Sequence, residues 1–330
     1  MKILYAIQGT GNGHIARAEE IVPVLQKYAN LDVFISGAQS NLKLPYPVKY
    51  KSKGLSFYFG KSGGIDLIKT FKYNSSKALY KEIKTFPVEK YDLVINDFEL
   101  ISAWACRRKN IPCLALSHQS ALLSPKVIKP KEYDLVGDWV LKNYAPADEH
   151  ISFHFARYDQ NIFTPVIRSR IRKAQVETKP HYTVYLPAYD DLKLVPLLLR
   201  FPRIQWHVFS KHTTRSYHIG KLSVYPVSNE EFTISMASAT AVLCGAGFET
   251  PAEALYLGKK LMVVPMKLQY EQQYNAAALK QLGVPVLKKV KKKYLDKIGE
   301  WIENNDRLTV NYEDIADEAV QAALNTGLKK

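Results

Sequence analysis

The chain has 330 residues, of which 47% are hydrophobic and 23% are charged, which suits two domains of ordinary size with sizeable cores. No apolar run reaches the roughly 18 residues needed to span a bilayer, and Met1–Gln8 lacks the features of a signal peptide. Three cysteines in apolar surroundings favour a reducing compartment over a disulfide framework. We therefore expect a cytoplasmic protein.

The formal net charge is +15, from 46 basic and 31 acidic residues. An excess of this size favours an anionic partner, such as nucleic acid, anionic lipid or a phosphorylated ligand. No nucleic-acid-binding module is recognisable, so nucleic acid is the weakest of these three. A generally cationic surface without a specific partner stays open as an alternative.

Short apolar runs rich in β-formers alternate with helical patterns along the whole chain. The expected strands are Ile3–Ile7, Leu31–Ser36, Val48–Tyr50, Leu93–Asn96, Cys113–Ser117, His150–Phe155, Tyr182–Leu186, Gln205–Phe209, Ser223–Val227, Ala241–Cys244, Leu261–Pro265 and Val284–Lys288. The expected helices include Ile15–Tyr28, Leu100–Lys109, Glu230–Ala237, Thr250–Leu257 and Glu271–Leu282. This alternation predicts an α/β protein whose parallel sheets carry helices on both faces.

A domain boundary is expected within Arg168–Pro180, which is charged, poor in large apolar residues and ends in proline. It divides the chain into an acceptor-binding domain, residues 1–168, and a donor-binding domain, residues 180–330, with the last helix able to pack back on the first domain. Two doubly wound domains then face each other across a cleft. Ligands of such sheets bind beyond the carboxyl ends of the strands, so motifs at strand ends are the places to search.

The segment Gly63–Phe86 mixes large apolar side chains with five lysines. A basic amphipathic segment of this kind can lie on an anionic membrane. The alternative is an ordinary surface helix whose apolar face packs on the core.

A glycine-rich loop, Gly9–His14, follows the first expected strand. Its glycines permit sharp turns and a close approach to a ligand, and the start of the next helix offers free N–H groups to an anion, so Gly11, Asn12 and Gly13 are candidate donor-binding residues. The pattern fits neither the dinucleotide fingerprint nor a Walker loop. An imidazole at the mouth of such a loop is suited to proton transfer, which makes His14 a candidate general base; a structural His is the alternative.

Asp97 ends the strand Leu93–Asn96 and precedes a helix. There it can accept the second N–H of the His14 imidazole, which would fix the tautomer and stabilise the imidazolium. The alternative is that Asp97 caps the following helix.

A second small-residue loop follows the strand Ala241–Cys244 and leads into a helix. It predicts a diphosphate site formed by the residues Gly245, Ala246, Gly247, Phe248, Glu249 and Thr250. One turn later Glu253 can accept two hydrogen bonds from ribose hydroxyls. Beyond the next strand, Glu271, Gln272 and Gln273 form a cluster suited to neutral sugar hydroxyls, which both donate and accept.

Together these motifs resemble the nucleotide-sugar glycosyltransferases with two Rossmann-like domains, the GT-B type, and are most similar to the peptidoglycan N-acetylglucosaminyltransferase and galactolipid synthase group. The likeness is concentrated in residues 226–283. It implies that Glu253 binds ribose, that Gln272 and Gln273 bind the donor sugar, and that His14 and Asp97 are the base and its support. Ser210, at the end of a strand, is a candidate phosphate contact, and the backbone of Val227 to Asn229, which includes Ser228, falls where the family reads uracil.

Two features depart from this pattern. Glu249 adds a charge beside the expected phosphates, and residues 43–89, where acceptors usually bind, match no known segment. The acceptor therefore stays open: the alternatives are a lipid-linked acceptor, with peripheral contact with the inner membrane face, a soluble glycan and a small phenol.

The sequence predicts a metal-independent, inverting hexosyltransferase that uses a nucleoside-diphosphate sugar, with UDP as the expected nucleotide. It contains no Asp-x-Asp metal pair, and no cofactor is expected. The leaving diphosphate would be stabilised by loop amides and the helix dipole. Two alternatives remain: a nucleotide-sugar 2-epimerase, and a non-catalytic protein of the same fold that binds nucleotides or anionic lipids.

Overall fold

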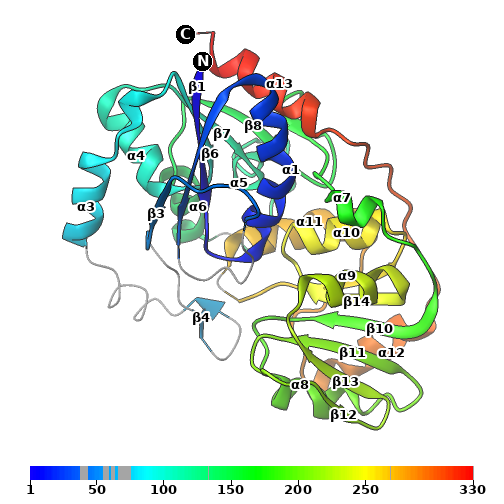
Figure 1. Ribbon diagram of the computed structural model, residues 1–330. Coiled ribbons are helices and arrows are strands. Elements are labelled where there is room, and N and C mark those ends of the chain that lie inside the picture. Colours follow the sequence, from blue (N-terminus) through cyan, green and yellow to red (C-terminus); the bar gives the residue numbers. More distant parts are fainter. Residues whose placement is uncertain are drawn as a thin grey trace.

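The computed structural model describes residues 1–37, 44–54, 59–60, 64–65, 76–132, 134–267 and 269–329. Two large, mostly parallel sheets with helices packed around them make up the molecule (Figure 1). This arrangement confirms the predicted α/β class. We call the part built on the first sheet the N-terminal half and the part built on the second sheet the C-terminal half.

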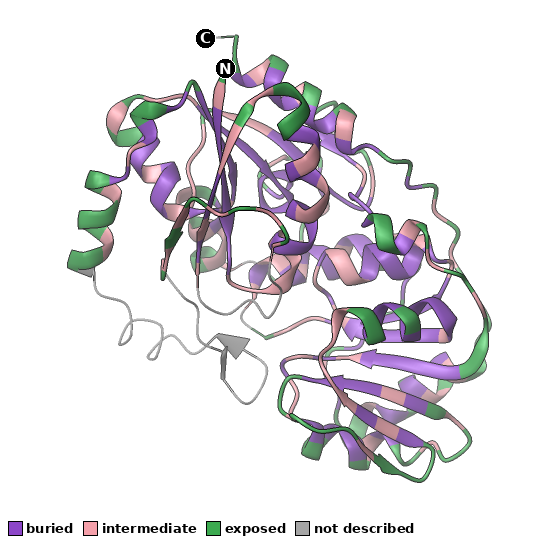
Figure 2. Cartoon of the chain, in the orientation of Figure 1, coloured by how far each residue is buried: buried purple, intermediate pink, exposed green. Residues whose placement is uncertain are grey.

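The sheet of the N-terminal half has seven described strands in the order β3-β2-β1-β6-β7-β8-β9, and all of its pairings are parallel. Its strands are β1 (Lys2–Gln8), β2 (Asn30–Ser36), β3 (Tyr50–Ser52), β6 (Leu93–Asp97), β7 (Cys113–Ser117), β8 (Glu149–Phe153) and β9 (Ile162–Phe163), and a separate hairpin joins β4 (Phe59–Gly60) to β5 (Gly64–Ile65). The central strands are buried on both faces, as Figure 2 shows, which explains their continuous apolar runs.

The helices of this half are α1 (Asn12–Tyr28), α3 (Ser76–Thr85), α4 (Leu100–Lys109), α5 (His118–Ala121), α6 (Leu135–Asn143) and α7 (Ser169–Arg172), with a 3-10 turn, η1 (Val88–Lys90). The helix α1 begins three residues earlier than expected, so His14 lies in its first turn rather than in the loop. Gly11 precedes the helix with a φ of 101°, a conformation that favours glycine and lets the helix start this early.

The sheet of the C-terminal half has six described strands in the order β12-β13-β11-β10-β14-β15. These strands are β10 (Lys179–Tyr185), β11 (Gln205–Ser210), β12 (Tyr217–Ile219), β13 (Leu222–Pro226), β14 (Ala239–Gly245) and β15 (Lys260–Val264). The helices in this part of the chain are α8 (Asp191–Leu198), α9 (Asn229–Ser238), α10 (Glu249–Tyr256), α11 (Tyr270–Gln281), α12 (Leu295–Glu303) and α13 (Ala316–Gly327), with a 3-10 turn, η2 (Lys292–Tyr294). Only β12 runs antiparallel to its neighbour.

Two strand predictions need correction. Val284–Lys288 is not a strand: it forms an isolated bridge between Val286 and Val263, and its apolar side chains fill gaps in the core. The third strand of the N-terminal half lies at Tyr50–Ser52, later than the predicted Val48–Tyr50, because it pairs with the end of β2. The remaining predicted strands overlap observed ones.

In the segment predicted to be basic and amphipathic, Gly63–Phe86, residues 63 and 66–75 lie outside the described residues. Its last part is α3, where Leu79 and Ile83 pack against the core while the lysines face outward. In this part the surface-helix interpretation holds. No helix among the described residues is both long and apolar enough to cross a membrane. The three cysteines are free and buried.

The halves are tied together at several places. The C-terminal helix α13 returns to the N-terminal half and packs against α1, β7 and β8 (Figure 1). A Cβ at Gly327 would lie 2.8 Å from Leu93, so a side chain there would hold α13 away from the sheet. The helix α1 also contacts α10, and α6 contacts α11. Residues of both halves therefore meet beyond the carboxyl ends of the strands.

Candidate active site

His14 and Asp97 form a hydrogen-bonded pair. In the parallel register Asp97 lies opposite Ile7, just before the glycine loop, so the end of β6 and the start of α1 meet. The Nδ1 atom of His14 lies 2.9 Å from Oδ1 of Asp97, which is fully buried, while 12% of the His14 side chain is exposed. Nη2 of Arg17 lies 3.2 Å from the same Nδ1 atom. In the tautomer whose Nδ1–H donates to Asp97, Nε2 carries the lone pair that can accept a proton. The geometry is the one that the sequence predicts; the catalytic role stays a prediction.

The alternative role for Asp97, as a helix cap, is wrong. The cap of α4 is Glu99, whose carboxylate accepts hydrogen bonds from the backbone N–H groups of Ile101 and Ser102, both at 2.7 Å. Asp97 instead forms hydrogen bonds with side chains.

A third residue, Arg17, completes this cluster and was missed by the sequence analysis. Its guanidinium donates to both carboxylate oxygens of Asp97, with Nη2–Oδ1 at 2.7 Å and Nε–Oδ2 at 3.2 Å. Arg17 is 2% exposed. It lies three residues after His14, on the same face of α1, and this spacing was the available signal.

Electrostatics keep the Asp97 carboxylate ionised. Burial alone would raise its pKa, but the charges of Arg17 and His14 and their hydrogen bonds hold the pKa below its ordinary value. Burial likewise acts to lower the pKa of Arg17, but Asp97 and Glu249 raise it. The cluster is thus a permanent set of charges beside the imidazole.

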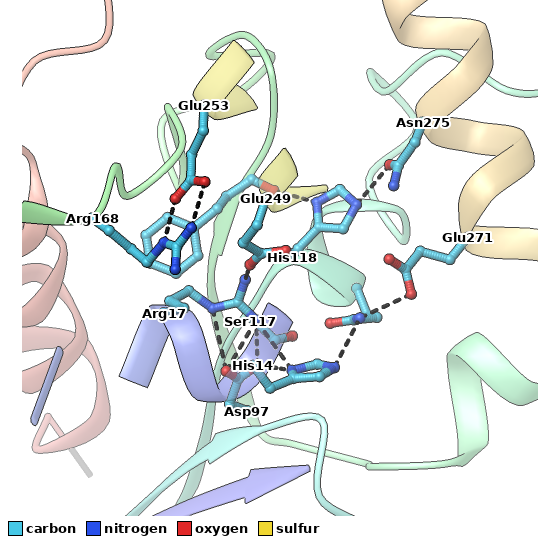
Figure 3. A network of polar contacts seen from close by, with 12 residues as sticks. His14, Arg17, Asp97, Ser117, His118, Arg168, Glu249, Glu253, Glu271 and Asn275 are labelled. Carbon is cyan, nitrogen blue, oxygen red and sulfur yellow. Dashed lines mark hydrogen bonds and ion pairs between the residues drawn. The ribbon is translucent and has the colours of Figure 1, made fainter. Parts of the chain in front are cut away.

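Glu249, from the second small-residue loop, reaches across to this cluster. Its carboxylate pairs with Nη1 of Arg17, so the dashed lines in Figure 3 run from Glu249 through Arg17 to Asp97 and His14. A Cβ on Gly13 would lie 2.7 Å from Oε2 of Glu249. The glycine loop and the predicted phosphate loop therefore lie directly against each other.

Gln119 links His14 to the predicted sugar-binding cluster. This residue of α5 has its Nε2 atom 3.4 Å from Nε2 of His14, and it donates to Oε2 of Glu271 at 3.0 Å. Gln119 was not predicted, although it follows the carboxyl end of β7, at the same edge of the sheet as Asp97.

The neighbouring His118 makes a second connection between the halves. Its ring stacks on Phe248 at a centroid distance of 3.9 Å, and its Nε2 lies 2.7 Å from Oδ1 of Asn275. Burial lowers its pKa, and its other ring nitrogen, Nδ1, lies 2.8 Å from the carbonyl oxygen of Phe153. We assign His118 a packing role.

Glu253, predicted to bind ribose, is 2% exposed and forms a bidentate ion pair with Arg168. The two contacts are Nε–Oε1 at 2.5 Å and Nη2–Oε2 at 2.7 Å. Arg168 also donates to Oδ1 of Asn229 at 2.6 Å. Both carboxylate oxygens are therefore engaged within the protein, and the ribose role stays a prediction.

Gln272 and Gln273, predicted to bind the donor sugar, both contact the loop that follows β15. Gln272 accepts from the backbone N–H of Met266 at 2.9 Å, and Gln273 donates to the Met266 carbonyl at 3.1 Å. Gln272 lies next to Gly245 in the phosphate loop, 3.9 Å from a Cβ built there. Both glutamines thus order the loop after β15, and their sugar-binding roles stay predictions.

Two further predicted residues lie apart from the His14 cluster. The Ser210 hydroxyl donates to Asp191 at 2.6 Å, and Ser228, beside Val227, caps α9. No group of three or more His, Cys, Asp or Glu side chains among the described residues is placed to hold a metal ion. A hollow of about 470 Å³ lies elsewhere, against the face of the second sheet, where it is lined in part by His207 and Tyr225.

Comparisons with known proteins agree with this architecture. The model of Glycosyl transferase family 1 matches residues 1–304. Among solved structures, the glycotransferase of kitacinnamycin is 13% identical with a TM-score of 0.55, and the match covers 99% of this chain and 94% of that one. Arabidopsis thaliana UGT89C1 complexed with UDP is 12% identical with a TM-score of 0.57, covering 99% and 93%.

A third neighbour is MurG of Acinetobacter baumannii, 14% identical with a TM-score of 0.50 and coverage of 98% and 95%. At these identities the structures show the fold alone, the GT-B arrangement of two Rossmann-like domains. A search of functionally curated proteins finds no match. Because the family model spans most of the sequence, the chain belongs to glycosyl transferase family 1 and is a glycosyltransferase.

Proposed function

We propose that this enzyme transfers a hexose from a UDP-sugar to an acceptor hydroxyl in one inverting displacement that requires no metal ion. The hydrogen-bonded pair of His14 and Asp97 carries this proposal. It places an imidazole, paired with a buried carboxylate, beside the loop predicted to bind the diphosphate.

In the proposed reaction, Nε2 of His14 takes the proton of the acceptor hydroxyl as its oxygen attacks the anomeric carbon. The bond between that carbon and the diphosphate oxygen breaks, and its electron pair leaves with the nucleoside diphosphate. The ionised Asp97 then stabilises the imidazolium through Nδ1–H. A base in this position contributes roughly 10²–10⁴-fold to the rate.

The donor is expected to lie at the start of α10. The backbone N–H groups of Gly247–Thr250 precede or open this helix, where the dipole favours an anion. They would stabilise the charge that develops on the leaving diphosphate, which removes the need for a divalent cation. The solved UDP complex of UGT89C1, which shares the fold, supports UDP as the nucleotide to test first.

The acceptor is proposed to be lipid-linked, with the enzyme resting on an anionic membrane surface. The basic charge of +15 supports this, as do three apolar side chains on α6 whose exposed fractions are large, Leu135 (74%), Val136 (65%) and Trp139 (63%). Sedimentation with vesicles rich in anionic lipid tests it: we expect salt-sensitive binding that Trp139→Ala weakens. Equal binding to neutral vesicles, or none, would remove this part of the proposal.

The test of the catalytic proposal compares wild type with His14→Ala and His14→Gln. Thermal shift with UDP-glucose, UDP-GlcNAc and GDP-mannose first identifies the donor, because a bound donor raises the melting temperature. Donor consumption is then followed with and without EDTA. We expect EDTA to have no effect, donor binding to survive in both variants, and turnover to fall roughly 10²–10⁴-fold.

Turnover of the His14 variants within threefold of wild type would contradict the base role. An EDTA-sensitive rate would contradict metal independence. Conversion of UDP-GlcNAc alone into another nucleotide sugar would identify a 2-epimerase instead.

A further inference from the structure

Considered alone, Asp97 and Arg17 cancel each other and leave no net charge to offset an imidazolium at His14. Arg17 donates three of its contacts to Asp97, at 2.7, 3.0 and 3.2 Å, and so opposes the negative charge that Asp97 presents to His14. A neutralised Asp97 would give an imidazolium little support. A second carboxylate that pairs with Arg17 gives the cluster of two carboxylates and one guanidinium a net charge of one negative unit.

That second carboxylate comes from the other half of the molecule. We propose that Glu249 is a positioning residue that acts through Arg17: it balances the guanidinium so that Asp97 supports the base, and this pairing holds the Glu249 charge away from the donor diphosphate. The inference rests on the proposed function of His14 as the base. It accounts for a charge at the phosphate loop that the sequence left unexplained.

The position of the Glu249 side chain supports this role. Glu249 is the first residue of α10, within the loop whose amides are expected to meet the diphosphate. Its side chain turns instead toward α1 and packs against Gly13, where any Cβ would meet Oε2 at 2.7 Å. The absence of a side chain at Gly13 thus makes room for this carboxylate. Glu249 is 18% exposed, while its partner Arg17 is 2% exposed.

The pairing also couples the two halves. Asp97 and Arg17 belong to β6 and α1, whereas Glu249 begins α10. The charge balance is complete only when the phosphate loop lies against the glycine loop. The His14 imidazole would therefore be fully supported as a base only when the predicted phosphate loop is in this position.

Other ionisable groups face His14 or the cluster from the elements packed around it. They are Tyr5 on β1, His118 on α5, Arg168 before α7 and Glu271 on α11, which reaches His14 through Gln119. All of these side chains are retained when Glu249 is replaced, but the Glu249 charge also raises the pKa of Tyr5, His118 and Arg168, and that contribution is lost with it. A change in the pH profile of a Glu249 variant therefore reports the charge of Glu249.

The central test is Glu249→Gln, which keeps the shape of the side chain and removes its charge. We expect kcat to fall roughly 3- to 10-fold and the acid limb of the kcat/KM profile to move to lower pH, because the imidazole loses a negative neighbour. Glu318→Gln, which removes a carboxylate from an exposed ion pair with Arg157, is the matched control and should behave as wild type.

The second part of the claim is tested with Arg17→Met. This variant frees the Glu249 charge beside the diphosphate, so KM for the donor should rise. Adding Glu249→Gln should restore the KM but not kcat. A merely structural ion pair predicts no such rescue, and where Arg17→Met fails to fold, the Glu249→Gln profile still decides the proposal.

An unchanged kcat and acid limb in Glu249→Gln would overturn the inference, as would a donor KM in the double variant no lower than in Arg17→Met. The His14→Ala variant separates this failure from that of the proposed function. If His14→Ala is inactive while Glu249→Gln matches wild type, only the present inference fails. If His14→Ala stays active, the proposed function itself fails.

Discussion

Asp97 accepts hydrogen bonds from both His14 and Arg17 and has no exposed surface. In Asp97→Asn the amide cannot carry the charge that stabilises the imidazolium, and it can select the wrong tautomer. We expect kcat to fall roughly 10²–10⁴-fold with little change in donor affinity. Steady-state kinetics and donor titration measure the two effects, with the exposed Asp92→Asn as control. A loss confined to donor affinity would contradict the supporting role.

The lowered pKa of Asp97 also predicts how stability depends on pH. Its folded pKa lies below the unfolded value of about 3.9, so its contribution is fully present above that value and is lost as the pH falls through the folded pKa. The difference in free energy of unfolding between wild type and Asp97→Asn should therefore shrink on acidification from about pH 5 to pH 3. Denaturant unfolding across this range measures it, and a constant difference would contradict the assignment.

At the scale of single residues, the sequence predicts the site only in part. His14 and Asp97 follow from their places after parallel strands, since those ends share one edge of the sheet. Arg17 and Gln119 were not predicted, because helical spacing and a strand end do not tell which side chains meet. The Arg168–Glu253 pair was missed for the same reason: its members are 85 residues apart.

At the scale of elements, α10 presents two carboxylates one turn apart to different partners in the chain. Glu249 forms an ion pair with Arg17, and Glu253 forms one with Arg168, the residue just before α7. In sequence, the position of Glu253 one turn after the predicted phosphate loop suggests a carboxylate that binds ribose. The same position also suits a carboxylate that pairs with Arg168 in the segment connecting the two halves. The ion pair with Arg168 shows the second role, and ribose binding by Glu253 stays a prediction.

Glu253→Gln tests this reading. It leaves the guanidinium of Arg168, which is 5% exposed, without its countercharge, and removing one partner of a buried pair costs about 3–5 kcal/mol. We expect a clear drop in melting temperature without donor, and none in Glu318→Gln, whose ion pair is exposed. A wild-type melting temperature together with a large rise in donor KM would instead support ribose binding.

Element prediction was accurate where the burial pattern is strong. The helix α4 has the predicted bounds, and β7 matches its predicted run. The edge strand β12 was missed because it has only three residues, of which Tyr217 is half-buried and the other two are exposed. Val284–Lys288 was mistaken for a strand because an apolar run that fills a core looks the same in sequence.

At the scale of the whole molecule, the site exists because two separately built sheets bring their strand ends together. The N-terminal half supplies His14, Asp97 and Arg17, and the C-terminal half supplies Glu249, Glu271 and the loop predicted to bind the diphosphate. The sequence predicts both halves from their alternating elements. The contacts between the halves depend on side chains distant in sequence, and only the structure reveals them.

The most direct test of the account follows the anomer released from the donor when water is the acceptor. With the UDP-sugar that the thermal-shift screen selects, in its α-linked form, early ¹H NMR spectra are recorded before the free sugar mutarotates. A single displacement driven by His14 predicts that the β-anomer appears first, and that His14→Ala releases sugar far more slowly. Release of the α-anomer first, or an equal rate in His14→Ala, would contradict the account.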